Sequence, residues 1–100
     1  MIMHSHNYFV YITTNAERQV IYVGMTNDLN IRLTQHYQNR GNPHSFPGKH
    51  HCYYLIYWER YQYVLDAIDR EKEIKKWRRE KKIALIESLN PQWIFLNDEI

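Results

Sequence analysis

The chain has 100 residues and a formal net charge of +2, with 13 Lys and Arg residues, 11 Asp and Glu residues, and 44% hydrophobic residues. A chain of this length buries roughly 60 to 65% of its unfolded surface, which is too little for two cores, so we expect residues 1–100 to form one domain. One cysteine excludes an internal disulfide, and no apolar run approaches a membrane span, so we expect no membrane association and a cytoplasmic location.

Two alternating apolar runs, residues 8–14 and 20–24, flank a polar connector at residues 15–18. This pattern predicts a β-hairpin with a four-residue loop. In that register Tyr11 lies directly opposite Tyr22. Because side chains alternate along a strand, one face of the hairpin is then aliphatic and the other carries the tyrosines.

Gly24 ends the second strand, where a missing side chain suits a sharp turn or the close approach of a ligand. A helix is predicted to follow, capped by Asn27 or Asp28. Apolar residues recur every four positions along it and predict its buried stripe, which consists of Leu29, Leu33 and Tyr37.

Arg32 and His36 are also four residues apart, so they lie together beside the buried stripe of this helix. A cation and an imidazole close to Tyr11, Tyr22 and Gly24 would form a compact site for a phosphate. Ordinary packing and helix ion pairs explain each of these residues equally well when it is taken alone.

The second half of the chain begins with residues 39–49, which are rich in Gly, Pro, Asn and Ser and predict a long irregular loop. Residues 52–58 are continuously apolar and aromatic, which predicts a third strand covered on both faces. His50 and His51 precede this strand beside a cysteine, but the sequence has no second ligand pair at zinc spacing.

Residues 63–77 are predicted to form a second long helix, and Glu71 falls on its apolar side. Because an unpaired buried charge is very unfavourable, Glu71 must face a Lys, an Arg or a metal ion. Glu73 falls on the polar side with Arg70. The apolar residues that define the buried side are Val64, Ala67, Ile68 and Ile74.

A third helix is predicted over residues 79–89, ending at Asn90 and Pro91. Asn90 could orient a group in the site, and residues 96–100 are expected to be frayed. The inward positions of this helix are Ile83, Ile86 and Leu89.

Charge is concentrated in residues 70–82, which contain eight Lys or Arg and three Glu residues, a local charge of +5. A basic helical segment is typical of proteins that bind a phosphate backbone, and Lys75, Lys76 and Arg78 are its candidate phosphate contacts. A solvated helix with Glu-Lys pairs is the alternative.

Taken together, the motifs resemble those of the GIY-YIG nuclease superfamily. The first motif is represented by Phe9-Val10-Tyr11, with Phe9 in place of glycine, and the second by Tyr22-Val23-Gly24. The likeness continues through Arg32 and His36 and resumes at residues 67–76. The chain is similar to the small stand-alone bacterial members of the superfamily, which in turn are similar to the nuclease domain of the bacterial excision-repair incision enzyme.

The resemblance implies an α+β fold, with a small three-stranded antiparallel sheet flanked by about three helices. It also implies that the loop at residues 39–49 touches substrate through Phe46 and Lys49, and that Glu71 ligates a divalent metal. The chain shows no clustered carboxylates, and Mg²⁺ needs only one or two when phosphate and water complete its coordination. A one-metal site with Mg²⁺, for which Mn²⁺ can substitute, is therefore expected.

Two residues remain candidates for the general base. Ionising a free tyrosine at pH 7 costs about 4 kcal/mol, so His36 is the easier base on its reference pKa. The resemblance points instead to Tyr11, with Tyr22 and His36 positioning water or phosphate.

The leading interpretation is a Mg²⁺-dependent DNA endonuclease. The alternatives are a nucleic-acid-binding module that keeps the fold without cutting, and a structural or protein-interaction domain. No second domain is expected, so target choice rests on DNA structure, on low specificity or on a protein partner. The pathway, DNA repair included, and the oligomeric state stay open.

Overall fold

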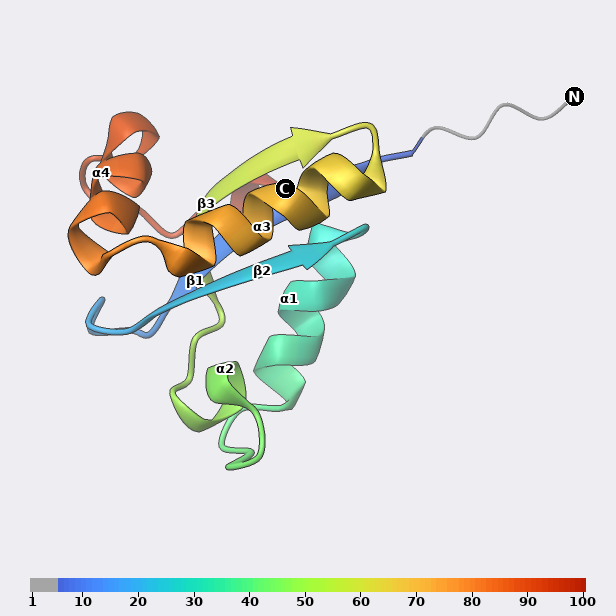
Figure 1. Ribbon diagram of the computed structural model, residues 1–100. Helices are drawn as coiled ribbons and strands as arrows, with labels where there is room; N and C mark the ends of the chain where they lie inside the picture. Colours follow the sequence, from blue (N-terminus) through green and yellow to red (C-terminus); the bar gives the residue numbers. More distant parts are fainter. Residues whose placement is uncertain (1–5) are drawn as a thin grey trace, which may run out of the picture.

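The computed structural model describes residues 6–100, which form a three-stranded sheet with helices on both faces (Figure 1). Both strand pairs are antiparallel, and the order across the sheet is β2-β1-β3. The strands are β1 (Tyr8–Thr14), β2 (Ile21–Thr26) and β3 (Tyr54–Tyr61). The helices are α1 (Leu29–Gln38), α2 (Phe46–Lys49), α3 (Val64–Lys76), α4 (Arg79–Leu89) and the 3₁₀ turn η1 (Asn97–Glu99). The predicted α+β fold, with three helices of seven or more residues, is confirmed.

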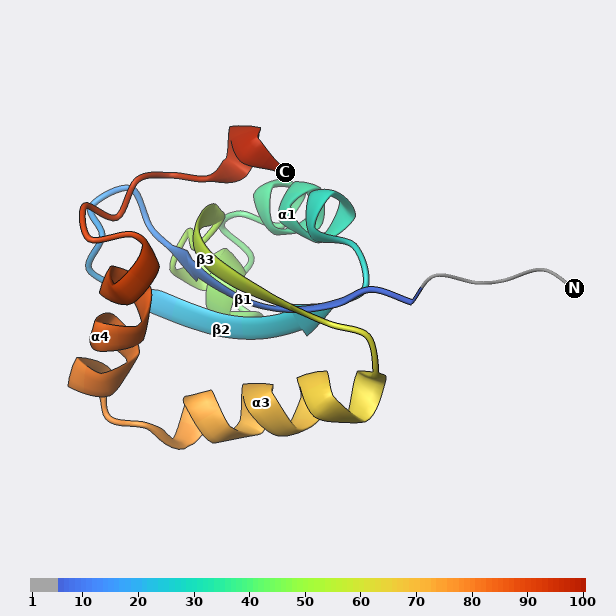
Figure 2. The same cartoon turned by 90° about the horizontal axis from the view of Figure 1, so that it is seen from above.

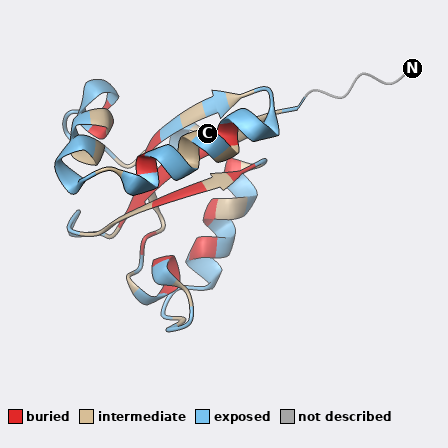
Figure 3. Cartoon of the chain, in the orientation of Figure 1, coloured by how far each residue is buried: buried red, intermediate tan, exposed pale blue. Residues whose placement is uncertain are grey.

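The sheet separates two packing layers, with α1 on one face and α3 on the other (Figure 2). The aliphatic face of β1 packs against α3 and α4, where Ala67, Ile74 and Ile86 are buried. The opposite face carries Tyr11, which packs with Leu33 of α1. Because β1 is the central strand, its residues 10–14 are all buried. Figure 3 shows that exposed residues predominate along α3 and α4, outside the sheet.

The hairpin register differs from the predicted one by two residues. Tyr11 lies opposite Gly24, and Tyr22 lies opposite Thr13. The reason is Asn15, whose side-chain oxygen accepts hydrogen bonds from the backbone N–H groups of Gln19 and Val20 at 2.8 and 3.0 Å and so closes a six-residue loop. A shift of two residues leaves every side chain on its predicted face, because the alternation also has period two.

Strand β3 was predicted over residues 52–58, but it begins at Tyr54, ends at Tyr61 and forms one edge of the sheet. Its first half is covered on both faces as predicted, because Leu55 and Ile56 are buried in the two different core clusters. The C-terminal segment covers part of that edge. Leu96 N–H donates to the Leu55 carbonyl at 2.7 Å, and the Asn97 side chain accepts from Leu55 N–H at 2.8 Å. The prediction that residues 96–100 are frayed was therefore wrong.

The two C-terminal helices lie within one residue of their predicted bounds, but some inward positions were wrong. Leu89 is 73% exposed, because α4 ends there and the chain turns away through Asn90. Val64, at the first position of α3, is also exposed. In α1, His36 is buried and Tyr37 is 49% exposed, because a hydrogen bond draws His36 toward the sheet.

Asn90 is a structural residue, and the prediction that it could orient a site group is not supported by its contacts. Its side-chain nitrogen donates to the carbonyls of Ile56 and Ile94, both at 2.9 Å, and its oxygen accepts from Ile94 N–H at 2.9 Å. These bonds join the end of α4 to β3 and to the C-terminal segment.

We predict that Asn90→Ala lowers the free energy of unfolding by about 2 kcal/mol, because it leaves buried backbone groups without partners. Urea denaturation would measure the change. Gln92→Ala, at an exposed neighbouring position, is the control and should change stability by less than about 0.5 kcal/mol. Equal effects of the two substitutions would contradict the role assigned to Asn90.

Candidate active site

Tyr11 is at the centre of the candidate site and is fully buried on β1. Its ring lies over Gly24 on β2, and a methyl group at that position would overlap the Tyr11 hydroxyl and ring. The glycine is therefore required by the close approach of a side chain from the neighbouring strand. The sequence singled out Gly24 for this kind of reason, although its predicted role was a contact with substrate.

His36 is the hydrogen-bond partner of Tyr11. The Tyr11 hydroxyl and His36 Nε2 are 2.8 Å apart, and the bond is buried. His36 belongs to the last turn of α1, whose start is fixed by Asp28: its side chain accepts a hydrogen bond from Ile31 N–H at 3.0 Å. Of the two predicted caps, Asp28 is the one used, and the phase of the helix that follows turns His36 toward the sheet.

The protonation states of this pair follow from their surroundings. Burial, with a smaller contribution from the Arg32 charge, lowers the pKa of His36 to about 4. Burial also raises the pKa of Tyr11 well above that of a free tyrosine, and Tyr22 adds to this effect while Arg32 opposes it. At neutral pH the histidine is therefore uncharged, and in the tautomer that carries its hydrogen on Nδ1 the Tyr11 hydroxyl donates to Nε2.

Tyr22 extends the cluster toward the surface through a row of rings. Its centroid is 5.7 Å from that of His36 and 6.0 Å from that of Phe46, which is 48% exposed. Phe46 in turn lies 4.5 Å from the His50 ring. The segment at residues 39–49 thus lies beside the site as expected, although it contains the short helix α2.

Glu71 of α3 contributes the acidic group. Its side chain is 20% exposed, and Oε2 is 3.4 Å from Lys75 Nζ, which fits the expectation that Glu71 faces a cation. Lys75 Nζ also lies 5.7 Å from the centroid of the Tyr22 ring. The Glu71 charge acts on the pKa of Tyr11, in the direction that raises it. The structure therefore brings the carboxylate of α3 and the hydroxyl of β1 into one electrostatic environment.

An ion pair that the sequence did not reveal anchors α3 next to Glu71. Arg70 was assigned to the polar side, yet its Nε is 3.0 Å from Glu59 Oε1 on β3. The hydroxyls of Tyr57 and Tyr61 donate to the same carboxylate. These bonds hold the pKa of Glu59 below its usual value against the opposing effect of burial. The alternation of Tyr57, Glu59 and Tyr61 along the strand was the one sign of this network in the sequence, because it places the three side chains on the same face.

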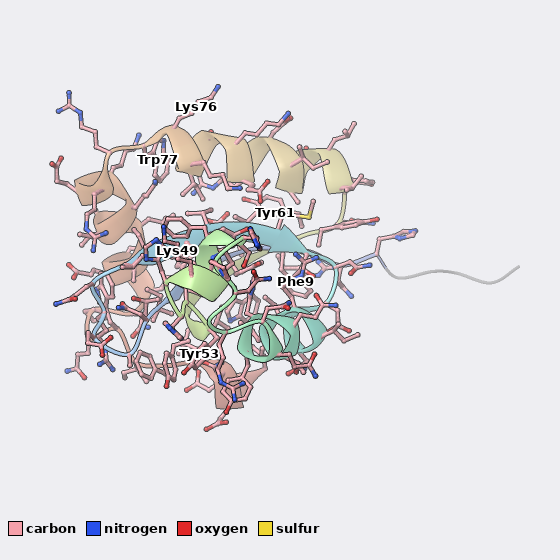
Figure 4. All side chains as sticks on the ribbon, turned by 90° about the horizontal axis from the view of Figure 1, so that it is seen from below. Phe9, Lys49, Tyr53, Tyr61, Lys76 and Trp77 are labelled. Atoms are coloured by element: carbon pink, nitrogen blue, oxygen red, sulfur yellow. The ribbon has the colours of Figure 1, made fainter. Side chains whose placement is uncertain are left out.

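Other predicted contact residues lie farther out. Lys49, Lys76 and Arg78 are exposed. Figure 4 shows Lys49 on α2, and Lys76 and Trp77 near the end of α3. Of Lys75, Lys76 and Arg78, the structure places Lys75 against the cluster. The remaining ones extend the positive surface beyond it.

The residues present fit a metal ion whose coordination is completed by the substrate. Within residues 6–100, no group of three or more His, Cys, Asp or Glu side chains is arranged to hold a metal. The partly exposed Glu71 carboxylate offers one oxygen ligand, which suits Mg²⁺ when phosphate oxygens and water supply the others. The donor set fits neither a zinc centre nor a preformed calcium cage.

Comparison with known proteins identifies the class. Residues 7–84 match the model of the GIY-YIG catalytic domain, and the chain belongs to the GIY-YIG family. It is 37% identical over 84 residues to UPF0213 proteins of Staphylococcus aureus strains N315 and MW2, a match that covers 84% of this chain and 96% of those proteins.

A solved structure shows the same fold. The solution NMR structure of a UPF0213 protein from Bacillus halodurans superimposes with a TM-score of 0.56 at 23% identity, covering 87% of this chain and 89% of that one. In the part of the chain that the structure describes, no helix has the length and apolar character to cross a membrane.

We predict that His36 titrates near pH 4, which an NMR pH titration of its ring protons would measure. Arg32→Ala should raise this pKa yet leave it below 6.5, because burial has the larger effect. Gln35→Ala, exposed on the same helix, is the control. Because unfolded chains bind this proton more readily, stability should fall as the pH is lowered from about 6.5 to 4. A His36 pKa at or above 6.5 would contradict the buried, neutral assignment.

Proposed function

We propose that the protein is a Mg²⁺-dependent DNA endonuclease that hydrolyses phosphodiester bonds by a one-metal mechanism. The observation that carries the proposal is the buried hydrogen bond between Tyr11 and His36, with Arg32 and Glu71 acting on the same hydroxyl. This combination joins proton transfer, phosphate binding and a metal ligand within one cluster. Membership in the GIY-YIG family supports the same class of reaction.

Tyr11 and His36 act together as the base. Neither suffices alone, because Tyr11 holds its proton at neutral pH and His36 is buried. As water attacks the phosphate, the Tyr11 oxygen accepts the proton of the water while its own proton passes to His36 Nε2. No free phenolate has to form, and the negative charge of bound DNA favours the protonated imidazole. Tyr11 and His36, the two candidates for the general base, then form one proton relay.

Arg32 and Tyr22 position the phosphate. Arg32 lies one turn before His36 on α1, and its charge acts on both members of the relay. A guanidinium suits the phosphate because it presents several donors to its oxygens. The Tyr22 ring lies between His36 and Phe46, so its hydroxyl can orient water or phosphate at the mouth of the site.

Glu71 would hold the metal. When Mg²⁺ or Mn²⁺ is bound there, its charge would stabilise the negative charge that develops on the scissile phosphate and the leaving oxygen. Lys75 is 3.4 Å from the carboxylate and adds positive charge for the DNA backbone. The exposed Lys49, Lys76 and Arg78 extend that attraction along the DNA. Selection of a target by a protein partner is compatible with this surface.

We predict that Glu71→Gln lowers the cleavage rate by about a thousandfold, because the metal ligand is lost, while DNA binding in EDTA is retained. Glu73→Gln is the matched control, since Glu73 lies two residues away on α3 and is 54% exposed. Cleavage of branched, nicked and linear DNA would be measured with Mg²⁺, Mn²⁺ or EDTA. Salt-sensitive binding without cutting by the unaltered protein would contradict the nuclease proposal and favour a non-cleaving binding module.

We predict that Tyr11→Phe abolishes cleavage and leaves DNA affinity within about twofold, because the ring still fills the space over Gly24 while the proton path is lost. Tyr63→Phe is the control, because it also removes one tyrosine hydroxyl, at a 64% exposed position outside the cluster. Single-turnover rates and binding constants would be compared. Undiminished cleavage by Tyr11→Phe would remove Tyr11 from the mechanism.

A further inference from the structure

A groove of about 540 Å³ lies outside the Tyr11 cluster, between α1, the start of β3 and the C-terminal segment. Arg32 and His36 are on one flank of α1, and the groove follows the opposite flank, where Tyr37 is exposed. Four of its nine lining residues are aromatic, and the others are Asn30, Leu33, Thr34, Asn97 and Asp98. The four rings are Tyr37, Tyr53, Tyr54 and Phe95.

These four rings form a continuous row. Tyr37 meets Tyr53 edge-on with the ring centroids 5.1 Å apart, Tyr53 lies 4.6 Å from Tyr54, and Tyr54 stacks on Phe95 at 4.2 Å. All four keep part of their surface open to solvent. Phe95 packs against the core under α3 and α4, whereas Tyr37, Tyr53 and Tyr54 belong to neither core cluster of the described residues. The exposed surface of the three tyrosines is therefore not explained by core packing.

An arginine closes each end of the row. The Arg40 guanidinium lies 3.9 Å from the centroid of Tyr37, and its Nη1 donates to the Tyr37 carbonyl at 2.8 Å. The Arg18 guanidinium lies 4.1 Å from the centroid of Phe95, and its Nε donates to the Trp93 carbonyl at 3.0 Å.

Both guanidiniums are held in place by stacking and by backbone carbonyls. Among the residues described, neither has a carboxylate within ion-pairing distance; the ion pairs of these residues involve Arg70 and Lys75. The positive charges of Arg18 and Arg40 are therefore available to an anionic ligand. Asp98 also lines the groove, so an anion would be repelled beside this carboxylate and attracted to the two arginines.

We propose that this groove binds single-stranded nucleic acid, with unstacked bases against the tyrosines and the flanking phosphates at Arg18 and Arg40. Aromatic faces bind bases without regard to sequence, and guanidiniums bind phosphates. The Asp98 carboxylate can accept a hydrogen bond from the amino group of a base. A duplex cannot use the groove, because its bases are stacked on one another.

This inference about the groove rests on the proposed function, because the nuclease proposal supplies nucleic acid as the class of ligand. Leu33 lines the groove and also packs against Tyr11, so a layer of apolar side chains separates the two sites. A strand bound at both would have to be unpaired beside the cleaved phosphodiester. The substrate class that fits is DNA with a single-stranded segment next to the scissile bond.

The test compares the binding of a labelled, unstructured oligonucleotide of about ten nucleotides with that of a blunt duplex, by fluorescence anisotropy in EDTA. Tyr37→Ala and Arg40→Gln alter exposed side chains, and circular dichroism would confirm their folding. Tyr63→Ala is the matched control, because Tyr63 is 64% exposed at the start of α3. We expect the dissociation constant for the oligonucleotide to rise about tenfold for Tyr37→Ala, and to rise also for Arg40→Gln. The Tyr63→Ala protein and all duplex values should stay within about twofold.

Equal effects of Tyr37→Ala and Tyr63→Ala, or no binding of the oligonucleotide by the unaltered protein, would overturn the proposal. So would binding of a proline-rich peptide in the groove without binding of the oligonucleotide, since aromatic grooves also accept that ligand. The cleavage assay is independent of this result. Absent cleavage with a Tyr37-dependent affinity would reject the nuclease proposal alone, and cleavage without that dependence would reject the groove alone.

Discussion

The hydrogen bond between Tyr11 and His36 is the interaction on which the rest of the site depends. It joins the central strand to the last turn of α1, and both residues are buried. Neither polar group could be buried without the other, because an unpaired buried hydroxyl or imidazole is costly. Gly24 leaves room for the tyrosine, and Asp28 starts the helix in the phase that delivers the histidine.

Local patterns predicted the elements of the fold well, because each element depends mostly on its own residues. The bounds of α3 and α4 follow from apolar periodicity and from Pro91, and the hairpin follows from alternation. The register was missed because Asn15 closes the loop with its side chain, which the spacing of apolar residues does not reveal. The predicted grouping of the site residues is unaffected, because a shift of two residues leaves each side chain on the same face of its strand.

Features that depend on partners distant in the sequence could not be predicted in this way. Periodicity favoured Tyr37 over His36 as the buried residue of α1. It could not reveal that His36 binds Tyr11, which is 25 residues away in the sequence. The Glu59 to Arg70 pair joins β3 to α3 through the tertiary packing alone. Asn97 was assigned to a frayed end, although it binds the edge of β3. In each case the side chain is polar, and its partner is known only once the chain has folded.

The site divides its chemistry according to what each step requires of water. Proton transfer between Tyr11 and His36 benefits from burial, which keeps the histidine neutral and able to accept a hydrogen. Metal binding by a lone carboxylate requires access for water and phosphate, and Glu71 is correspondingly only partly buried, on the opposite layer of the fold. On the proposed mechanism, DNA must complete the metal site, so the protein alone would bind Mg²⁺ weakly.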